Sequence, residues 1–184
     1  MTYSGAMTAD GFALFGTAIG SCGIAWGANG IVGTQLPEGT DARTRARLVS
    51  RFPDAPESFP PPRIQDAIDD IAALLRGDVV DLLDVPLDMD GVADFDVRVY
   101  DETRAIPPGK TLSYGDVSAR LGLPGAAQAV GQALGRNPFV IIVPCHRVLA
   151  ADGKMHGFSA GGGIATKRRM LVIEGAIDDE PTLF

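Results

Sequence analysis

The stretch Asn137-Pro-Phe-Val-Ile-Ile-Val-Pro-Cys-His-Arg-Val148 leads an apolar run to a single cysteine, Cys145. Four β-branched residues, Val140 to Val143, lie in this stretch between two prolines. β-Branched residues bounded by prolines are typical of a short buried strand or extended segment. We therefore expect this segment to lie in the core and to hold Cys145 at a fixed depth.

Cys145 is the candidate nucleophile of the chain. A free thiol has a pKa of about 8.5, so little of it is thiolate at neutral pH, and an adjacent imidazole or helix N-terminus usually raises that fraction. His146 follows directly and is one of two histidines in the chain. An inert core thiol is the plain alternative for such a pair. Two flanking prolines and the charged Arg147 are a poor composition for a core segment, which favours a functional site.

The motif Pro144-Cys145-His146-Arg147-Val148 resembles the acceptor motif of the O6-alkylguanine-DNA alkyltransferases, the methylated-DNA–protein-cysteine methyltransferases. The resemblance covers about residues 8 to 176. Other matches fall in the family's order and approximate spacing: Gly109-Lys-Thr-Leu-Ser-Tyr114, Ala129-Val-Gly131, Asn137-Pro138 and Glu174-Gly175.

The expected fold class is α+β. A small N-terminal antiparallel sheet with helices precedes a mostly helical C-terminal domain that contains a helix-turn-helix and the acceptor cysteine. We expect a ribonuclease-H-like α/β domain over residues 1–90 and a DNA-binding and alkyl-acceptor domain over residues 91–176. Residues 177–184 form an acidic tail.

The N-terminal half predicts sheet and helix but no chemistry. Short apolar runs punctuated by glycines from Phe12 to Leu36 indicate two or three antiparallel strands, with a hairpin turn at Ala28-Asn29-Gly30. Cys22 and Trp26 lie in this pattern and are expected in the core.

Helices are expected over residues 41–51, with Asp41 as the cap, and over residues 62–76. Residues 52–62 form a proline-rich loop, and residues 79–87 are expected to be extended.

The C-terminal half predicts a helix over residues 95–106 and two short helices joined by a glycine-containing connector. The first begins after the cap Ser113 and runs to about Leu121, and the second spans about residues 126–135. A last helix is expected over residues 166–174.

The helix over residues 126–135 consists mostly of small residues. A helix that reads the major groove carries long polar side chains, and this one offers only Gln128 and Gln132. Close packing on another helix is one explanation. The resemblance implies a second, in which the backbone approaches the DNA minor groove and contacts phosphates without sequence preference. The residues it implies at the DNA are Tyr114, Lys110, Gln128, Ala129, Gly131 and Arg136.

The resemblance also implies how alkyl transfer would proceed. Cys145 is the nucleophile and permanent acceptor, His146 its base through a water, and Glu174 the group that orients His146. Tyr114 lies at the target phosphate and supplies its hydroxyl to the leaving purine. Asn137 ties the recognition helix to the acceptor segment.

Arg147 is implied to be structural, and Val148, Phe158 and Ser159 to line the base pocket. Two features depart from the family. Gln128 stands where an arginine finger is usual, and it lacks the charge and reach of guanidinium. The loop Gly157–Thr166 is about two residues longer than is common and rich in glycine, which affects the size of the pocket.

Charge is divided unevenly along the 184 residues, whose net charge is -7. Residues 1–97 hold six Lys/Arg against fifteen Asp/Glu, whereas residues 98–176 hold ten against five. The basic half suits a phosphate backbone, although ordinary surface charge is the alternative.

We expect a soluble, cytoplasmic and nucleoid-associated protein, because no apolar stretch is long enough to span a membrane and no secretory signal is evident. Two scattered cysteines and no ligand spacing predict a reduced protein with no structural metal and no cofactor.

Three functions remain distinguishable. The leading one is direct DNA repair, by irreversible transfer of an alkyl group from O6-alkylguanine, with O4-alkylthymine as a further candidate. The second is a module that binds alkylated bases with weak or no transfer because of Gln128. The third, a cysteine hydrolase, lacks an evident oxyanion arrangement. The expected partner is double-stranded DNA with alkylated bases, bound by a monomer, with a weak protein partner conceivable at Leu183-Phe184.

Overall fold

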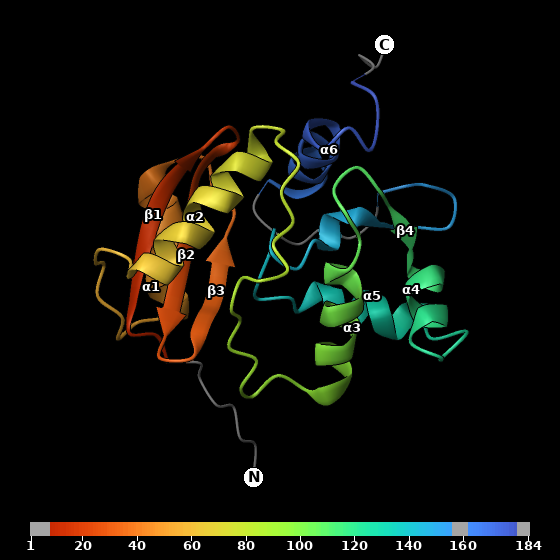
Figure 1. Ribbon diagram of the computed structural model, residues 1–184, viewed down its shortest axis with the longest axis horizontal. Helices are drawn as coiled ribbons and strands as arrows, with labels where there is room; N and C mark the ends of the chain where they lie inside the picture. Colours follow the sequence, from red (N-terminus) through yellow and green to blue (C-terminus); the bar gives the residue numbers. More distant parts are fainter. Residues whose placement is uncertain (1–7, 156–161, 180–184) are drawn as a thin grey trace.

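The computed structural model describes residues 8–155 and 162–179. It has a three-stranded sheet and two helices in the N-terminal half, and helices with a two-stranded ladder in the C-terminal half (Figure 1), so the α+β class is confirmed. The elements are β1 (Gly11–Thr17), β2 (Gly20–Gly27), β3 (Gly30–Gln35), α1 (Asp41–Arg51), α2 (Pro62–Leu75), α3 (Asp94–Arg104), β4 (Leu112–Ser113), α4 (Tyr114–Arg120), α5 (Ala127–Gly135), the 3-10 helix η1 (Cys145–Arg147), β5 (Val148–Leu149) and α6 (Gly163–Ile173).

The sheet is an antiparallel meander in the order β1-β2-β3. Gly27 pairs with Gly30, so the predicted hairpin turn is confirmed, but its two central residues are Ala28 and Asn29, and Gly30 already belongs to β3. Successive side chains of a strand point to opposite faces, so β2 contributes Ile24 to one side of the sheet and Ala25 to the other.

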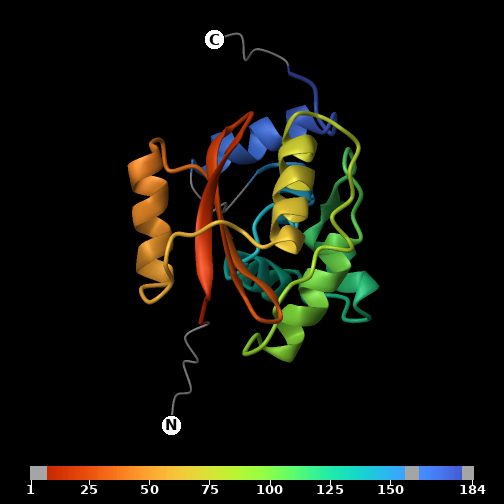
Figure 2. The ribbon, with the colours of Figure 1, turned by 60° about the vertical axis from the view of Figure 1, so that its left-hand side comes forward.

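Helices cover both faces of the sheet (Figure 2). On one face α1 packs Leu48 and Phe52 against Ala25 and Val32, and it approaches closely because Gly23 has no Cβ to meet Leu48. On the other face α2 buries its apolar stripe in the main core. The sheet therefore separates the small apolar cluster under α1 from the main core.

The ends of α1 and α6 differ from the sequence expectation. Thr40, in extended conformation, caps α1 by accepting a hydrogen bond from the Arg43 amide at 3.3 Å. Asp41 is instead in the first turn of α1, where its negative charge interacts favourably with the helix dipole. The predicted Asp41 cap is therefore wrong, and α6 begins at Gly163 rather than at Thr166.

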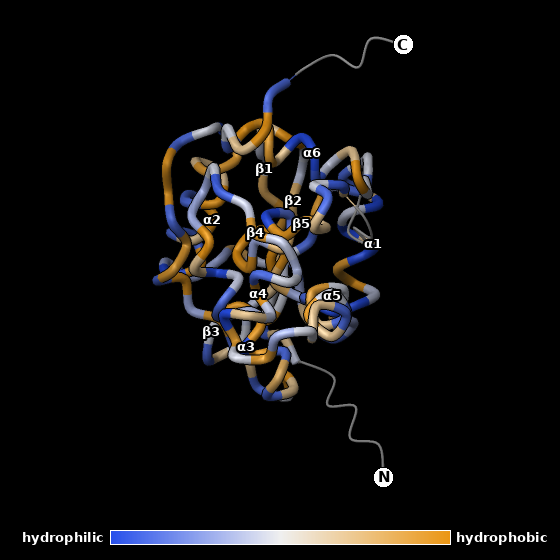
Figure 3. The backbone as a smooth tube through the Cα atoms, turned by 90° about the vertical axis from the view of Figure 1, so that its right-hand side faces the viewer, coloured by the Kyte–Doolittle hydropathy of each residue, from blue (hydrophilic) through white to orange (hydrophobic). Residues whose placement is uncertain are grey.

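The helix-turn-helix is confirmed as α4 and α5. Ser113 and Asp116 form a reciprocal capping box at the start of α4. The connector turns through Gly122 and Gly125, which both have positive φ. In Figure 3, parts of α5 are coloured toward the hydrophobic end of the scale, in keeping with its alanines, Val130 and Leu134.

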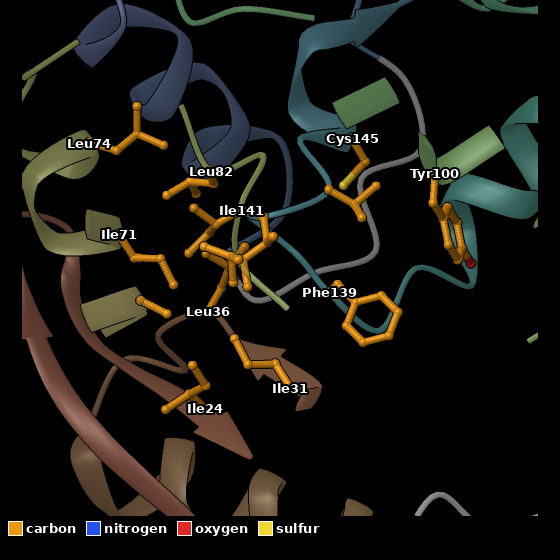
Figure 4. Packing of buried hydrophobic residues seen from close by; sticks show 14 of the residues in the cluster. Ile24, Ile31, Leu36, Ile71, Leu74, Leu82, Tyr100, Phe139, Ile141 and Cys145 are labelled. Carbon is orange, nitrogen blue, oxygen red and sulfur yellow. The ribbon is translucent and has the colours of Figure 1, made fainter. Parts of the chain in front are cut away.

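One apolar cluster joins the two halves. Figure 4 shows Ile24 and Ile31 from the sheet, and Leu36 directly after β3, in one cluster with side chains of α2 and with Phe139 and Ile141 from the segment before Cys145. The acceptor segment is also tied to the sheet, because the Thr34 amide donates to the Pro138 carbonyl at 2.9 Å. Cys145 thus follows a segment, residues 137–143, that contacts both halves of the molecule.

Two segments expected to be extended are not strands. Within Val79–Leu87, a single bridge joins Leu87 to Ile31, and the backbone turns near Leu82. The segment Val140–Val143 is a tight turn, described below. None of the helices in the described ranges has the length and apolarity needed to cross a membrane.

Candidate active site

The acceptor segment is a buried turn and not the predicted strand. Val140 and Val143 bridge to each other, and between them Ile141 has a φ of 78°. A β-branched residue in the left-handed region is strained, so surrounding contacts must hold it. Asn137 supplies two of them: its Oδ1 accepts from the Phe139 amide at 2.9 Å, and its Nδ2 donates to the Val143 carbonyl at 3.0 Å. The β-branched run misled the strand prediction because side-chain hydrogen bonds overrode propensity.

Cys145 begins the 3-10 helix that follows this turn, and it is 8% exposed. Burial raises the pKa of the thiol, while a hydrogen bond from the Asn137 side chain and the charge of Lys167 act in the opposite direction. The thiol is therefore protonated at neutral pH in the resting protein. The expectation of an enlarged thiolate fraction is wrong for this state, and ionisation needs a base.

His146, Glu174 and Arg147 form a buried network behind the cysteine. Nε2 of His146 lies 2.8 Å from Oε1 of Glu174. Arg147 donates from Nε and Nη2 to the two Glu174 oxygens, each at 2.8 Å, and from Nη1 to the Ile106 carbonyl at 2.6 Å. Burial alone would raise the pKa of Glu174, but the hydrogen bonds from Arg147 and His146 hold that pKa at about 2. Glu174 is thus an ionised acceptor at any working pH.

The ionised carboxylate determines the tautomer of His146. Because Glu174 can only accept, Nε2 carries the proton and Nδ1 keeps a lone pair. Burial lowers the pKa of His146 despite the nearby carboxylate, so the ring is neutral. Within the described ranges, Nδ1 is buried and has no hydrogen-bond partner. The ring next to Cys145 therefore presents a free basic nitrogen.

A cleft of about 290 Å³ opens over Cys145. Both halves of the molecule line it, with Thr34, Gln35, Leu36, Glu38, Arg47 and Arg51 from the N-terminal half and Tyr114, Gly131, Leu134, Gly135, Arg136, Asn137, Pro138, Val140, Cys145 and Lys167 from the C-terminal half. The N-terminal half, for which the sequence predicts no chemistry, therefore contributes residues to the cleft. The cluster of arginines in residues 41–51 was the signal available in the sequence.

Lys167 is a site residue that the sequence reasoning missed. It is 1% exposed, its Nζ donates to the Val148 carbonyl at 2.8 Å, and it lines the cleft with Cys145. Burial lowers its pKa, and interaction with Cys145 raises it. The signal was its spacing: Lys167 precedes the buried Met170 and Leu171 by three and four residues, which places it on the inner face of α6.

The helix-turn-helix meets the cleft at Tyr114. This residue is the first of α4, and burial raises the pKa of its hydroxyl. A Cβ at Gly131 would lie 3.7 Å from the Tyr114 ring, so α5 rests on the ring at a position without a side chain. Gln128 is exposed on α5, and Ala129 is partly exposed. The predicted DNA-contacting face and the cysteine are therefore adjacent.

Other predicted site residues are placed differently. Arg136 lines the cleft but also forms a two-point ion pair with the buried Asp96, with both contacts at 2.9 Å. Lys110 is exposed in the turn that follows Pro107. The Val148 side chain is fully buried in the core and is not among the cleft-lining residues.

Phe158 and Ser159 lie outside the described residues, as does the first half of the predicted loop Gly157–Thr166, whose end from Gly163 onward is already part of α6. In the part of the chain that the structure describes, no group of His, Cys, Asp and Glu side chains has the arrangement of a metal site.

Comparison with known proteins covers both halves. Residues 94–176 match the family model described as 6-O-methylguanine DNA methyltransferase, DNA binding domain. A methylated-DNA--protein-cysteine methyltransferase of Methanothermobacter thermautotrophicus is 37% identical over 153 residues, 83% of this chain and 78% of the relative. A DNA base-flipping protein of Thermus thermophilus is 38% identical over 135 residues, 73% of this chain and 86% of the relative. The crystal structure of Mycobacterium tuberculosis OGT in complex with DNA is similar with a TM-score of 0.72 at 36% identity, over 90% of this chain and 92% of that chain.

Proposed function

Because this chain belongs to the O6-methylguanine DNA methyltransferase family, we propose that it repairs DNA directly, by moving an alkyl group from O6-alkylguanine to the Cys145 sulfur. The family membership rests on a relative that is 37% identical over 83% of the chain. The thioether that forms on Cys145 is stable, and unmodified guanine remains in the DNA. Each molecule therefore reacts once, and the reaction requires no cofactor because the protein itself is the acceptor.

The transfer is a displacement at the alkyl carbon. The sulfur–carbon bond forms as the carbon–oxygen bond to the purine breaks, and the purine leaves with the electron pair. Nδ1 of His146 takes the thiol proton, through a water, and Glu174 stabilises the imidazolium that forms. The Tyr114 hydroxyl donates a hydrogen bond to the leaving purine. The purine finally gains one proton and the thiol has lost one, so the step balances.

The base must leave the duplex before the sulfur can reach it, because the O6 substituent of guanine lies on the major-groove edge of the base pair, whereas the protein approaches from the minor groove. Extrusion costs a few kcal/mol and is cheapest for a badly paired base. The small residues of α5 allow its backbone to enter the minor groove, with Gln128 facing the orphaned base. Base flipping is also what the Thermus thermophilus relative is named for.

The observation that carries the proposal is the free Nδ1 of a neutral His146, directly beside Cys145 in sequence and held by Glu174 at 2.8 Å. The test is the intact mass of the protein after incubation with a duplex that contains O6-methylguanine. We expect a permanent gain of one methyl group, lost in Cys145→Ala and kept in Cys22→Ala, since Cys22 is fully buried in the core.

The lesion-binding module is not favoured, because a binding module has no use for a thiol that lines the cleft and is followed directly by a neutral histidine. Protein that binds the duplex without gaining mass would support it. Turnover of an ester or amide would support the cysteine hydrolase. Neither result is compatible with alkyl transfer as the main function.

Further proposals follow from the same reaction. We infer that the protein acts as a monomer on double-stranded DNA, in the cytoplasm at the nucleoid, and that O4-alkylthymine is a second substrate. We keep residues 1–90, 91–176 and 177–184 as the proposed divisions of the chain, with the tail as a weak docking segment for another protein.

A further inference from the structure

Helix α1 carries a row of arginines that the alkyl transfer does not use. Arg43, Arg47 and Arg51 are spaced four residues apart, so they follow one face of the helix. Residues 1–97 contain fifteen Asp/Glu and only six Lys/Arg, four of which are on α1. The row is a positive strip on an otherwise acidic half.

This row begins in the cleft and continues outward. Arg47 and Arg51 line the cleft together with Cys145, Tyr114 and Gly131. Arg43 and Arg47 line an adjoining hollow, which shares Arg47 with the cleft. At a rise of 1.5 Å per residue the row extends over about 12 Å, which corresponds to roughly three base-pair steps of a duplex.

Within the described part of the chain, acids do not neutralise the charges of the row. There, Arg51 donates to neutral oxygens, those of Thr34 at 2.6 Å, Gln35 at 3.2 Å and Pro138 at 3.2 Å. Burial lowers the pKa of Arg51 and the charge of Arg47 lowers it further, so these two cations lie near each other.

No carboxylate forms an ion pair with Arg43, Arg47 or Arg51 among residues 8–155 and 162–179, although Arg45 of the same helix pairs with Glu57 at 2.7 Å. Glu38, the acid at the rim of both hollows, accepts a hydrogen bond from Gln35.

We propose that Arg43 and Arg47 extend the DNA interface onto the N-terminal half by contacting backbone phosphates that flank the extruded nucleotide. This inference rests on the function proposed above. A duplex seated on α5 with one nucleotide in the cleft must pass its backbone over the rim of that cleft, where Arg47 lies. Guanidinium forks bind phosphate oxygens well, and such contacts position DNA without reading its sequence. Arg51 is not included, because its guanidinium lies farther inside the cleft and already donates a hydrogen bond to the Pro138 carbonyl.

The test is the salt dependence of binding to an unmodified duplex, measured by fluorescence anisotropy. Each phosphate contact contributes about 0.9 to the slope of log affinity against log salt concentration. Arg47→Gln should lower the slope by about 0.9 and the double variant Arg43→Gln/Arg47→Gln by about 1.8, whereas Arg47→Lys should keep most of it. The matched control is Arg45→Gln, which removes the same charge from the same helix but from the face that pairs with Glu57.

Equal slopes for Arg47→Gln, Arg45→Gln and the unchanged protein would overturn the interface. Urea midpoints for each variant confirm that the fold is kept. Failure of the proposed function would give a different result. The mass of the protein would then stay unchanged after incubation with an O6-methylguanine duplex, whatever salt dependence the variants show. A methylated protein with unaltered slopes refutes only the arginine interface.

Discussion

Replacement of Glu174 by glutamine should destabilise the protein as well as slow its reaction. The Glu174 side chain is 2% exposed, and it contacts both Arg147 and His146 at 2.8 Å. Glutamine has nearly the same shape but no charge, so Arg147 would keep a buried positive charge without a counter-ion. Breaking a buried pair in this way is strongly destabilising.

The magnitude follows from the pKa of Glu174, which is about 2 against an ordinary value of 4.5. At about 1.4 kcal/mol per pKa unit, the folded state gains roughly 3 kcal/mol from the ionised form. Because the folded-state pKa is depressed, this stabilisation is complete above about pH 4.5 and is lost as the pH falls toward about 2. The difference between the unchanged protein and Glu174→Gln should therefore shrink in acid.

Urea unfolding at about pH 7 and about pH 3.5 measures this difference. We expect roughly 3 kcal/mol at the higher pH and about half of that at the lower. Glu57→Gln is the matched control, because its ion pair with Arg45 is 43% exposed on each side, and such pairs contribute less than about 1 kcal/mol. An unfolding free energy for Glu174→Gln equal to that of the control would refute the reasoning. The transfer rate of Glu174→Gln should fall by about 100-fold, since His146 loses the negative charge that stabilises its imidazolium.

Three other outcomes are expected. Burial lowers the pKa of His146 below its ordinary 6.5, so the single-turnover rate should hold from about pH 8 to about pH 6.5 and fall in more acid solution; a decline that begins above pH 7 would contradict a neutral buried ring. Lys167→Met removes the cation that lowers the pKa of the Cys145 thiol, and we expect that pKa to rise further, as measured by thiolate absorbance; the same change at the exposed Lys154 should leave it unaltered. Gln128→Arg should speed repair of an O6-methylguanine duplex by about tenfold, because guanidinium fills the space of the extruded base better, whereas Gln132→Arg should not; an unchanged or slower rate at position 128 would disprove the weak-flipping interpretation.

Local sequence determined much of this protein. Patterns of apolar residues, caps and glycines predicted a small antiparallel sheet of two or three strands, the helices and the helix-turn-helix, with most helix ends correct to within a few residues. They failed where long-range contacts decide the backbone, as at Ile141, whose left-handed conformation is held by side-chain bonds from Asn137. Backbone propensity depends only on a residue and its close neighbours in sequence, so it does not predict a conformation that side-chain hydrogen bonds impose.

The sequence by itself also predicted the reactive pair, because Cys145 and His146 are adjacent in a motif that resembles a known acceptor motif, although the structure buries that motif in the core. Only the tertiary structure decided how those groups ionise. It brings Glu174 within 2.8 Å of a ring 28 positions earlier in the chain, buries Lys167 beside the thiol, and places α1 at the rim of the cleft. A pKa depends on burial and on charges that are near in space, and neither is encoded in the spacing of residues along the chain.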